Sequence, residues 1–364
     1  MARFLLNSRI ARVSRALAAV IALNCACSGL FAAVVDDLYS VTVTRSMDLA
    51  PGQTPCALEE ETRLAMGRLL IRVTGRADAA LEPDLADMLL NACDYREAGG
   101  SLDRETVLIT FNRPAIEMAL VAREQPIWGS ERPQTLLWLA IDSGQGERGI
   151  LPARDVTSDL SSAFMKLQAD LREELAIIAV DRGLLLSLPL LDLEDMNALS
   201  FVDIWAGFND QVTRASERYE LDAVLSGRIR VTRFGVEVRW TLLKDGDQFA
   251  LAGNSIREGL DRLADFYAAE FSTLGGVHET LMRITGVESL DDYGRVMRYL
   301  ESLSLVDAVT TEELVDGALS LRVDARGGTV ILGRVVGLGR LLSALGLPPG
   351  ETPGGEGLMF GLNP

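Results

Sequence analysis

Lysine and histidine are nearly absent from this 364-residue chain, which has two lysines, Lys166 and Lys244, and one histidine, His278. A single histidine excludes a zinc site built from several histidines and argues against a Ser-His-Asp triad. Acidic side chains outnumber basic ones by 52 to 35, so the net charge is −17. Because an acidic protein repels phosphate backbones, and no basic patch follows the N-terminal segment, we expect no nucleic-acid partner.

Cofactor and nucleophile motifs are also missing. The chain has no Walker A sequence, no G-x-G-x-x-G dinucleotide fingerprint and no G-x-S-x-G elbow. The glycines of "RGGTVILGR" (326–334) come without the lysine that a phosphate loop needs. We therefore expect no cofactor, name no catalytic residue, and favour a protein that is not an enzyme while leaving that question open.

The N-terminal segment predicts export. An apolar stretch, "ALAAVIALNCAC" (16–27), follows a basic region, and no acid occurs before Asp36. This pattern is typical of a signal peptide, which we place at residues 1–33. The predicted location is the periplasm. An N-terminus that is not cleaved would instead tether the protein to the membrane.

Two cysteines, Cys56 and Cys93, follow the predicted signal peptide. An even pair in an oxidising compartment is a candidate disulfide. Two separate buried thiols explain the same residues equally well, and the sequence does not decide between them.

Alternating strand and helix patterns predict an α/β (α+β) fold of several units. Residues 34–125 form a small α+β unit, with strands at 38–46 and 106–112, helices at 57–73 and after Pro83, and a helix from about Pro114. A turn-rich connector (126–134) with Trp128 suggests a packed joint.

A central α/β domain with a mixed sheet is expected at 134–256. Its elements are strands at 135–142, 183–191 and 221–231, helices at 160–181 and 201–220, and a hairpin whose turn is "KDGD" (244–247). Residues 257–345 predict a long helix (257–272) and a ferredoxin-like unit with a last helix at 328–345. The Gly- and Pro-rich tail, 346–364, is expected to be disordered.

Two six-residue segments share a pattern: "LIRVTG" (70–75) and "LMRITG" (281–286). A duplicated unit would explain the match. Six residues also recur by chance in a chain this rich in leucine and arginine, and we favour that explanation.

The densest group of acids is "LPLLDLED" (188–195), where a leucine run meets Asp192, Glu194 and Asp195. Acids at this point can cap a following helix, which is the reading we favour. The end of a strand in an α/β sheet is also where ligands bind, so a divalent-ion or ligand site is an alternative, with Asp203 on the next helix as a further candidate. The spacing does not match a calcium loop, so any metal is unknown.

Four separated motifs carry a resemblance: "IWGSERPQTLLWLAID", "RGLLLSLPLLDLED", "LSFVDIWAGF" and "RYELDAVLSGRI". In order and spacing they resemble the proteobacterial exported family catalogued as domain of unknown function 2066, over residues 36–256. That resemblance implies an envelope location and no established activity. More loosely, the element order resembles periplasmic domains of the TolB N-terminal, curli-secretion-accessory and penicillin-binding-protein-activator type, which bind other proteins.

Together these observations predict a periplasmic protein-interaction or assembly module whose partners are unidentified envelope proteins. The alternative is an ion- or ligand-binding protein, or an enzyme, that uses the acids at 192–195. The oligomeric state is not indicated.

Overall fold

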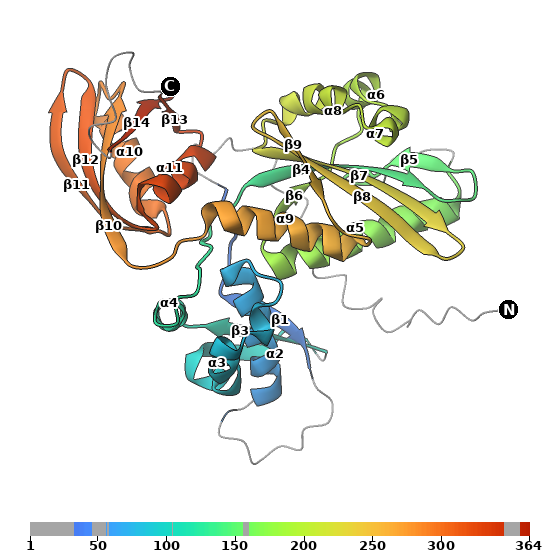
Figure 1. Cartoon of the computed structure of the whole chain (residues 1–364), viewed down its shortest axis with the longest axis horizontal. Helices are drawn as coiled ribbons and strands as arrows, with labels where there is room; N and C mark the ends of the chain where they lie inside the picture. Colours follow the sequence, from blue (N-terminus) through green and yellow to red (C-terminus); the bar gives the residue numbers. More distant parts are fainter. Residues whose placement is uncertain (1–32, 46–55, 57, 104, 156–159, 346–356) are drawn as a thin grey trace.

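Three sheet-based units make up the chain in a computed structural model that describes residues 33–45, 56, 58–103, 105–155, 160–345 and 357–364 (Figure 1). They confirm the α/β class with mixed sheets. The predicted signal peptide lies almost entirely outside the described residues. None of the described helices has the length and apolar character needed to cross a bilayer.

The N-terminal unit has a three-stranded antiparallel sheet in the order β1-β3-β2. Its elements are β1 (Ser40–Thr44), α2 (Glu59–Thr74), η1 (Ala79–Leu81), η2 (Pro83–Leu85), α3 (Ala86–Leu90), η3 (Ala92–Tyr95), β2 (Arg96–Ser101), β3 (Thr106–Phe111) and α4 (Arg113–Val121). Helix α2 packs Met66, Leu69 and Leu70 onto the sheet, forming a core of its own. The helix expected after Pro83 is shorter than predicted and is broken into 3-10 turns.

The central sheet has the order β5-β4-β7-β8-β9, and β6 pairs with the first half of β4. Its elements are β4 (Gln134–Asp142), β5 (Arg148–Ile150), α5 (Ser162–Arg182), β6 (Leu185–Ser187), α6 (Leu193–Ala198), α7 (Phe201–Ala206), α8 (Asn209–Ser216), η4 (Glu217–Tyr219), β7 (Ala223–Thr232), β8 (Gly235–Lys244), β9 (Asp247–Leu251) and α9 (Ile256–Phe271). Strand β4 is buried on both faces, as its apolar sequence predicts.

Helices cover both faces of this sheet. The helices α5 and α9 lie on one face and α6, α7 and α8 on the other (Figure 1). Leu137 and Leu139 of β4 belong to the core shared with α5 and α9, whereas Leu136 and Trp138 belong to the core shared with α7 and α8. The single helix expected over 201–220 is instead divided, because Gly207 adopts φ 78° and ends α7 before α8 begins.

The C-terminal unit has a five-stranded sheet in the order β11-β12-β10-β14-β13. Its elements are β10 (Val277–Thr285), α10 (Leu290–Ser302), β11 (Val306–Val315), β12 (Ala318–Arg326), α11 (Gly328–Leu338), β13 (Leu342–Ala344) and β14 (Gly357–Leu362). A ferredoxin-like β-α-β-β-α order is present, but β14 lies between β10, to which it is parallel, and β13.

Two expectations for this unit are therefore corrected. The last helix ends at Leu338 and does not continue to residue 345, because the chain turns outward at Gly339 and forms β13. The tail is not disordered throughout, because residues 357–362 form β14, whose Phe360 is 2% exposed and packs in the core. Leu358, Phe360 and Leu362 occupy every second position, as the residues on one face of a strand do, and the glycine and proline content of the tail obscured this pattern.

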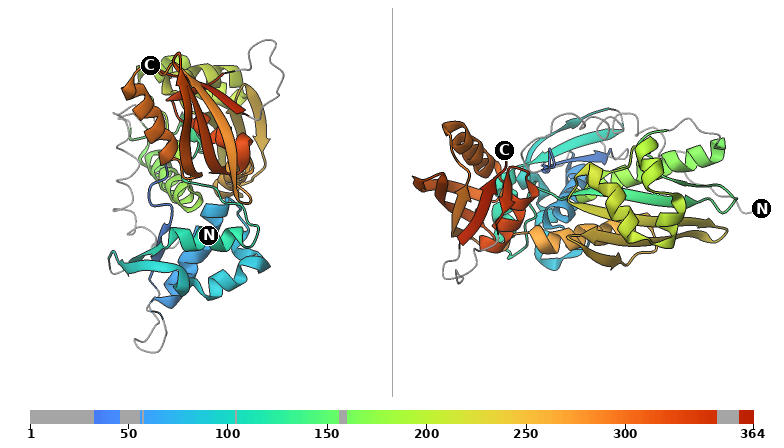
Figure 2. Two further views of the ribbon diagram at one scale, coloured as in Figure 1. Left: turned by 90° about the vertical axis from the view of Figure 1, so that its left-hand side faces the viewer. Right: turned by 90° about the horizontal axis from the view of Figure 1, so that it is seen from above.

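The three units meet at the connector 126–134. Trp128 is fully buried, its backbone N–H donates to Val73 O at 2.7 Å, and Ile127 pairs with Thr273 after α9. Figure 2 shows the N-terminal unit, in blue and cyan, lying below the other two in the side view. The connector is a packed joint.

Candidate functional site

The acidic loop at 192–195 is held together as a helix start. Asp192 caps α6 by accepting hydrogen bonds from the backbone N–H groups of Glu194 (3.1 Å) and Asp195 (3.0 Å). Such a cap satisfies donors that have no partner within the helix. This is the capping role that the sequence favoured.

A cation from this chain already lies between the loop's carboxylates. The Arg218 guanidinium donates to Asp192 at 2.8 and 2.9 Å and to Asp195 at 2.9 Å, with Glu194 at 3.6 Å. These hydrogen bonds to Arg218 hold the pKa of Asp192 far below its usual range. The three acids are thus brought together around an arginine.

Asp195 is the buried member of the loop, with no exposed surface. Its carboxylate accepts from the Leu191 backbone N–H at 2.8 Å and from the Tyr219 hydroxyl at 2.5 Å. Burial, followed by this bond to Asp195, raises the pKa of Tyr219. The hydroxyl therefore stays a donor at neutral pH and helps to fix the loop.

Asp203 does not join this group. It forms a capping box at the start of α7: its carboxylate accepts from Ser200 N at 2.8 Å, and its own N–H donates to Ser200 Oγ. Within the described residues, no three acidic, histidine or cysteine side chains gather where they could hold a metal ion.

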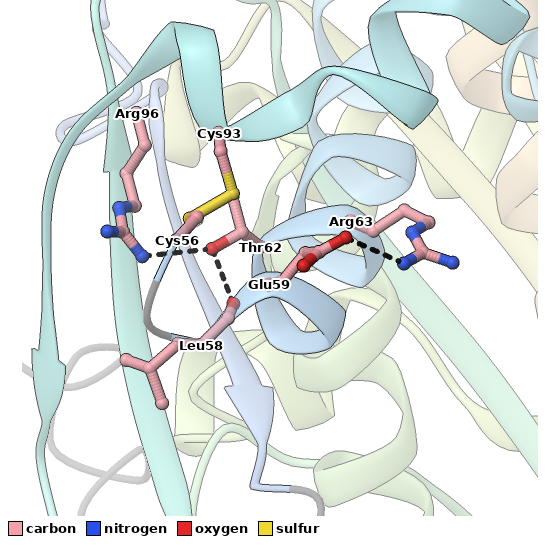
Figure 3. Close-up of a disulfide and its surroundings, with 7 residues drawn as sticks. All are labelled: Cys56, Leu58, Glu59, Thr62, Arg63, Cys93 and Arg96. Atoms are coloured by element: carbon pink, nitrogen blue, oxygen red, sulfur yellow. Dashed lines mark hydrogen bonds and ion pairs between the residues drawn. A yellow bond between two sulfur atoms is a disulfide. The ribbon is translucent and has the colours of Figure 1, made fainter. Parts of the chain in front are cut away.

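Cys56 and Cys93 form a disulfide, with sulfurs 2.06 Å apart (Figure 3). The bond joins the segment before α2 to η3. Beside it, Thr62 donates to Leu58 O at 2.6 Å and accepts from Arg96 at 3.3 Å. Of the two alternatives for these cysteines, the structure contains the disulfide. The bond fixes the segment directly before the first turn of α2.

A cleft of about 780 Å³ lies between the N-terminal unit and α9, and we call it the α2–α9 cleft. One wall is segment 74–78 after α2, and the other is the exposed face of α9 with the preceding loop 252–254. The walls meet closely at Gly75: a Cβ there would lie 2.2 Å from Ala268 Cβ. Gly75 has φ 73°, a conformation that favours glycine and that ends helix α2. The lack of a side chain at this position also allows the two walls to approach closely.

Charged side chains of both signs line this cleft. Asp78, Glu258, Asp261 and Asp265 are present with Arg76 and Arg262. Arg76 pairs with Asp78 at 3.2 Å, and Glu258 accepts from the Asn254 backbone N–H at 2.8 Å. Burial raises the pKa of Asp261, and the nearby arginines only partly oppose this. The lining of the cleft therefore includes charged groups of both signs that already have partners within the chain.

Arg182 connects the two walls of the cleft from outside its lining. It comes from the end of α5, is 2% exposed, and donates to Gly75 O at 2.7 Å and to Asp265 at 2.9 Å, with Asp261 at 3.3 Å. One guanidinium thus connects both walls. Its Nε has no hydrogen-bond partner among the described residues, so this arginine is held by part of its donor set.

A second buried arginine, Arg132, holds the connector. It donates to the carbonyls of Gly129 (2.6 Å), Trp128 (3.0 Å) and Arg72 (3.1 Å) and lies 3.5 Å from the centre of the Trp128 ring. Burial, with Arg72 and Arg182 nearby, lowers the pKa of Arg132. The joint between the N-terminal and central units therefore combines buried polar contacts with the buried ring of Trp128.

Comparison with known proteins gives one match. A family described as "Domain of unknown function (DUF8605)" matches residues 32–129, which is the N-terminal unit and the start of the connector. No curated protein matches the chain, and no solved structure does.

The resemblance to domain of unknown function 2066 is therefore wrong, and the looser likeness to TolB-type periplasmic domains has no support. The quoted motifs fall largely on β4, β6, α7 and β7, which build the core of the central unit. Apolar strands and helices of this kind recur in unrelated mixed sheets.

Arg182, Arg218 and the cleft were not found from the sequence. Each arginine is one of many in the chain, and neither stands near its carboxylate partners in sequence. One local feature could have drawn attention to Arg182. The segment "DRG" (181–183) is typical of a helix end, and it places Arg182 in the last turn before a glycine.

Proposed function

We propose that this protein is an exported interaction or assembly module of the cell envelope that receives part of a partner protein in the α2–α9 cleft. The observation that carries the proposal is the cleft itself, whose two walls belong to different units and are connected by Arg182. Clefts between units are common binding sites. Charged groups that are already hydrogen-bonded give a preformed surface and lower the cost of ordering on binding.

Export is supported by two independent features. The N-terminal sequence has the pattern of a signal peptide. The Cys56–Cys93 disulfide suits an oxidising compartment, because cytosolic thiols are kept reduced. Fractionation of the native host with N-terminal sequencing tests this part. An intact N-terminus in the cytosolic fraction would contradict it.

Site-specific crosslinking tests the cleft. A photo-reactive residue at Ala252, which is exposed and lines the cleft, should give a discrete protein adduct in the native host. The same residue at Phe234, 85% exposed on the β7–β8 hairpin, is the matched control. Adducts from both positions alike, or from neither, would count against the cleft as the docking site.

A further inference from the structure

Four arginines cross one face of the central sheet. Strand pairing places Arg148 of β5 beside Asp142 of β4, and Asp142 beside Arg230 of β7. On the same strand β7, Arg228 stands opposite Arg239 of β8. Because side chains alternate between the two faces of a strand, Arg228 and Arg230 share a face. We call Arg148, Arg228, Arg230 and Arg239 the arginine face.

Two aromatic rings of α7 connect these arginines. Phe201 and Trp205 stack with their ring centres 5.1 Å apart. The Arg148 guanidinium lies 6.0 Å from the centre of the Phe201 ring, and that of Arg230 lies 5.1 Å from the centre of the Trp205 ring. Arg228 donates to the Trp205 backbone carbonyl at 2.6 Å. These contacts make the surface continuous from β5 to β7 and place it on the side of the sheet that carries α7, away from α5 and α9 (Figure 1).

The fold leaves most of this positive charge without a counter-charge. Arg148 pairs with Asp142 at 3.1 Å. Within the described residues, none of the other three arginines forms an ion pair, and Arg230 and Arg239 are exposed. Arg228 and Arg239 are like charges directly opposite each other on neighbouring strands, an arrangement that lowers stability. A local arrangement that lowers stability is expected where a surface has a function.

The charge of this face is opposite to the charge of the whole chain. On this side of the sheet the strands carry the four arginines and two acids, Asp142 and Glu237, whereas the chain has a net charge of −17. Asp203 of α7 is already engaged in its capping box with Ser200. We expected no basic patch after the N-terminal segment. That expectation is wrong here, because strand pairing brings together arginines that are far apart in the sequence.

We propose that the arginine face binds an acidic segment of a partner protein. A guanidinium presents a planar set of donors that matches a carboxylate in two parallel hydrogen bonds. From β5 to β8 the face spans three strand spacings, about 14 Å, which suits a short segment. A long polyanion such as nucleic acid would continue past the face onto a surface that repels it. The face and the α2–α9 cleft lie on opposite sides of the central sheet, so this proposal is independent of the cleft.

Titration with an acidic peptide tests the proposal. The probe is a fluorescein-labelled peptide with the repeat Asp-Gly-Glu-Ser, titrated with the full chain. We expect the Arg230→Gln/Arg239→Gln variant to bind it at least about tenfold more weakly than wild type does. The control variant Arg63→Gln/Arg298→Gln removes the same charge from exposed arginines of α2 and α10, and its affinity should stay within about twofold of wild type.

Trp205 reports where the peptide binds. The other three tryptophans, Trp128, Trp138 and Trp240, are at most 3% exposed, whereas Trp205 is half-buried beside Arg230. Unlabelled peptide should therefore change the intrinsic fluorescence of wild type, and Trp205→Phe should bind the peptide but lose most of that change. Unchanged fluorescence of wild type with saturating peptide would place the peptide elsewhere and overturn the proposal.

The role of charge has its own controls. A peptide with Asn and Gln in place of the acids should bind at least about tenfold more weakly, and salt should weaken binding of the acidic peptide. Circular dichroism checks that each variant is folded. Failure of wild type to bind the acidic peptide would overturn the proposal, as would equal binding of the two peptides or equal weakening in the two double variants.

Other occupants give different results. An oligodeoxythymidine that binds more tightly than the acidic peptide, and whose binding is lost in Arg230→Gln/Arg239→Gln, would assign the face to nucleic acid and overturn the proposal. A dimer seen by sedimentation and lost in the same variant would assign it to a second copy of this chain, with the same consequence. A failed crosslink at Ala252 would bear only on the cleft.

Discussion

The N-terminal unit and the C-terminal unit contact the rest of the molecule through different kinds of interaction. The C-terminal unit shares one continuous apolar core with the central sheet, formed around α9 by residues such as Leu260, Tyr267 and Phe271. The N-terminal unit has a separate core. Apart from the buried connector residues Ile127 and Trp128, it meets the others through polar groups: Arg132, Arg182 and the ion pair of Glu117 with Arg326 at 2.8 Å.

An apolar interface and a polar joint contribute differently to the free energy of unfolding. An apolar interface gains free energy in proportion to the area that is removed from water. A buried polar joint gains little net energy, because the desolvation of charged groups offsets their contacts, but it is specific in geometry. We therefore expect the central and C-terminal units to unfold together and the N-terminal unit to open separately.

The largest expected effect comes from the shared core. Leu260→Ala removes a fully buried side chain of α9 and should cost about 2–5 kcal/mol of unfolding free energy. Hydrogen exchange should rise in the central and C-terminal units together. The matched variant Leu69→Ala, in the separate core of α2, should raise exchange mainly before residue 125. A rise confined to the central unit in Leu260→Ala would contradict a shared core.

The disulfide should stabilise the N-terminal unit alone. Its cysteines are 37 positions apart, and by the chain-entropy estimate Cys56→Ser/Cys93→Ser loses about 3–4 kcal/mol. Proteolysis of folded protein should then cut first within the N-terminal unit. Dithiothreitol should reproduce the effect in wild type and add nothing to the double variant, and any further loss in that variant would argue against the assignment.

Substitutions in the joint around Arg132 should lower stability less than loss of the disulfide does. Arg132→Ala removes the donor to three carbonyls, two of them in buried contacts, which costs about 1–3 kcal/mol, while repulsion from Arg72 and Arg182 is relieved. Exchange at Trp128 N–H and in α2 should rise. Arg132→Lys keeps the charge but not the planar donor set, so wild-type behaviour in that variant would show that the charge, and not the geometry, holds the joint.

Acid should have a smaller effect, limited to the α6 cap. The pKa of Asp192 is lowered on folding, so its contribution to stability is present above the unfolded value of about 4 and is lost as pH falls through the folded pKa. The melting temperature of Asp192→Asn, which keeps a capping side chain, should depend less on pH below about 4 than that of wild type. Parallel pH profiles would contradict this.

Calcium and magnesium should have no effect at this loop. Arg218 lies between Asp192 and Asp195 and satisfies both carboxylates. Because a cation would have to displace it, neither ion nor EDTA should move the melting temperature. A shift that disappears in Asp192→Asn/Asp195→Asn would support the ion-binding alternative instead.

Elements with strong local patterns could be predicted from the sequence. Strands β1, β3, β4 and β7 and helices α2, α5 and α9 lie close to their expected positions, since their apolar periods and caps are clear. Strand β2 was missed because "REAGGS" has no strand-forming residues, and its pairing with β3 decides its structure. The capping role of Asp192 could be predicted because this residue directly precedes a helix in the sequence. The contact of Arg218 with the same loop could not be predicted, because folding brings together residues that are far apart in the sequence.

The two similar six-residue segments show that a local sequence pattern does not by itself determine secondary structure. "LIRVTG" (70–75) ends helix α2, and "LMRITG" (281–286) lies largely in strand β10. Almost the same letters form different structures, because in β10 they pair with β12 on one side and β14 on the other. The two segments are therefore not copies of one structural unit, which agrees with the chance match favoured from the sequence.

The interior position of β14 has a consequence for how this unit closes. Strands β10 and β13 both pair with residues 357–362, which follow the other strands of this sheet in the chain. The sheet therefore stays open between β10 and β13 until β14 is in place, and a variant truncated before Gly357 would expose two bare strand edges to proteases and to neighbouring chains.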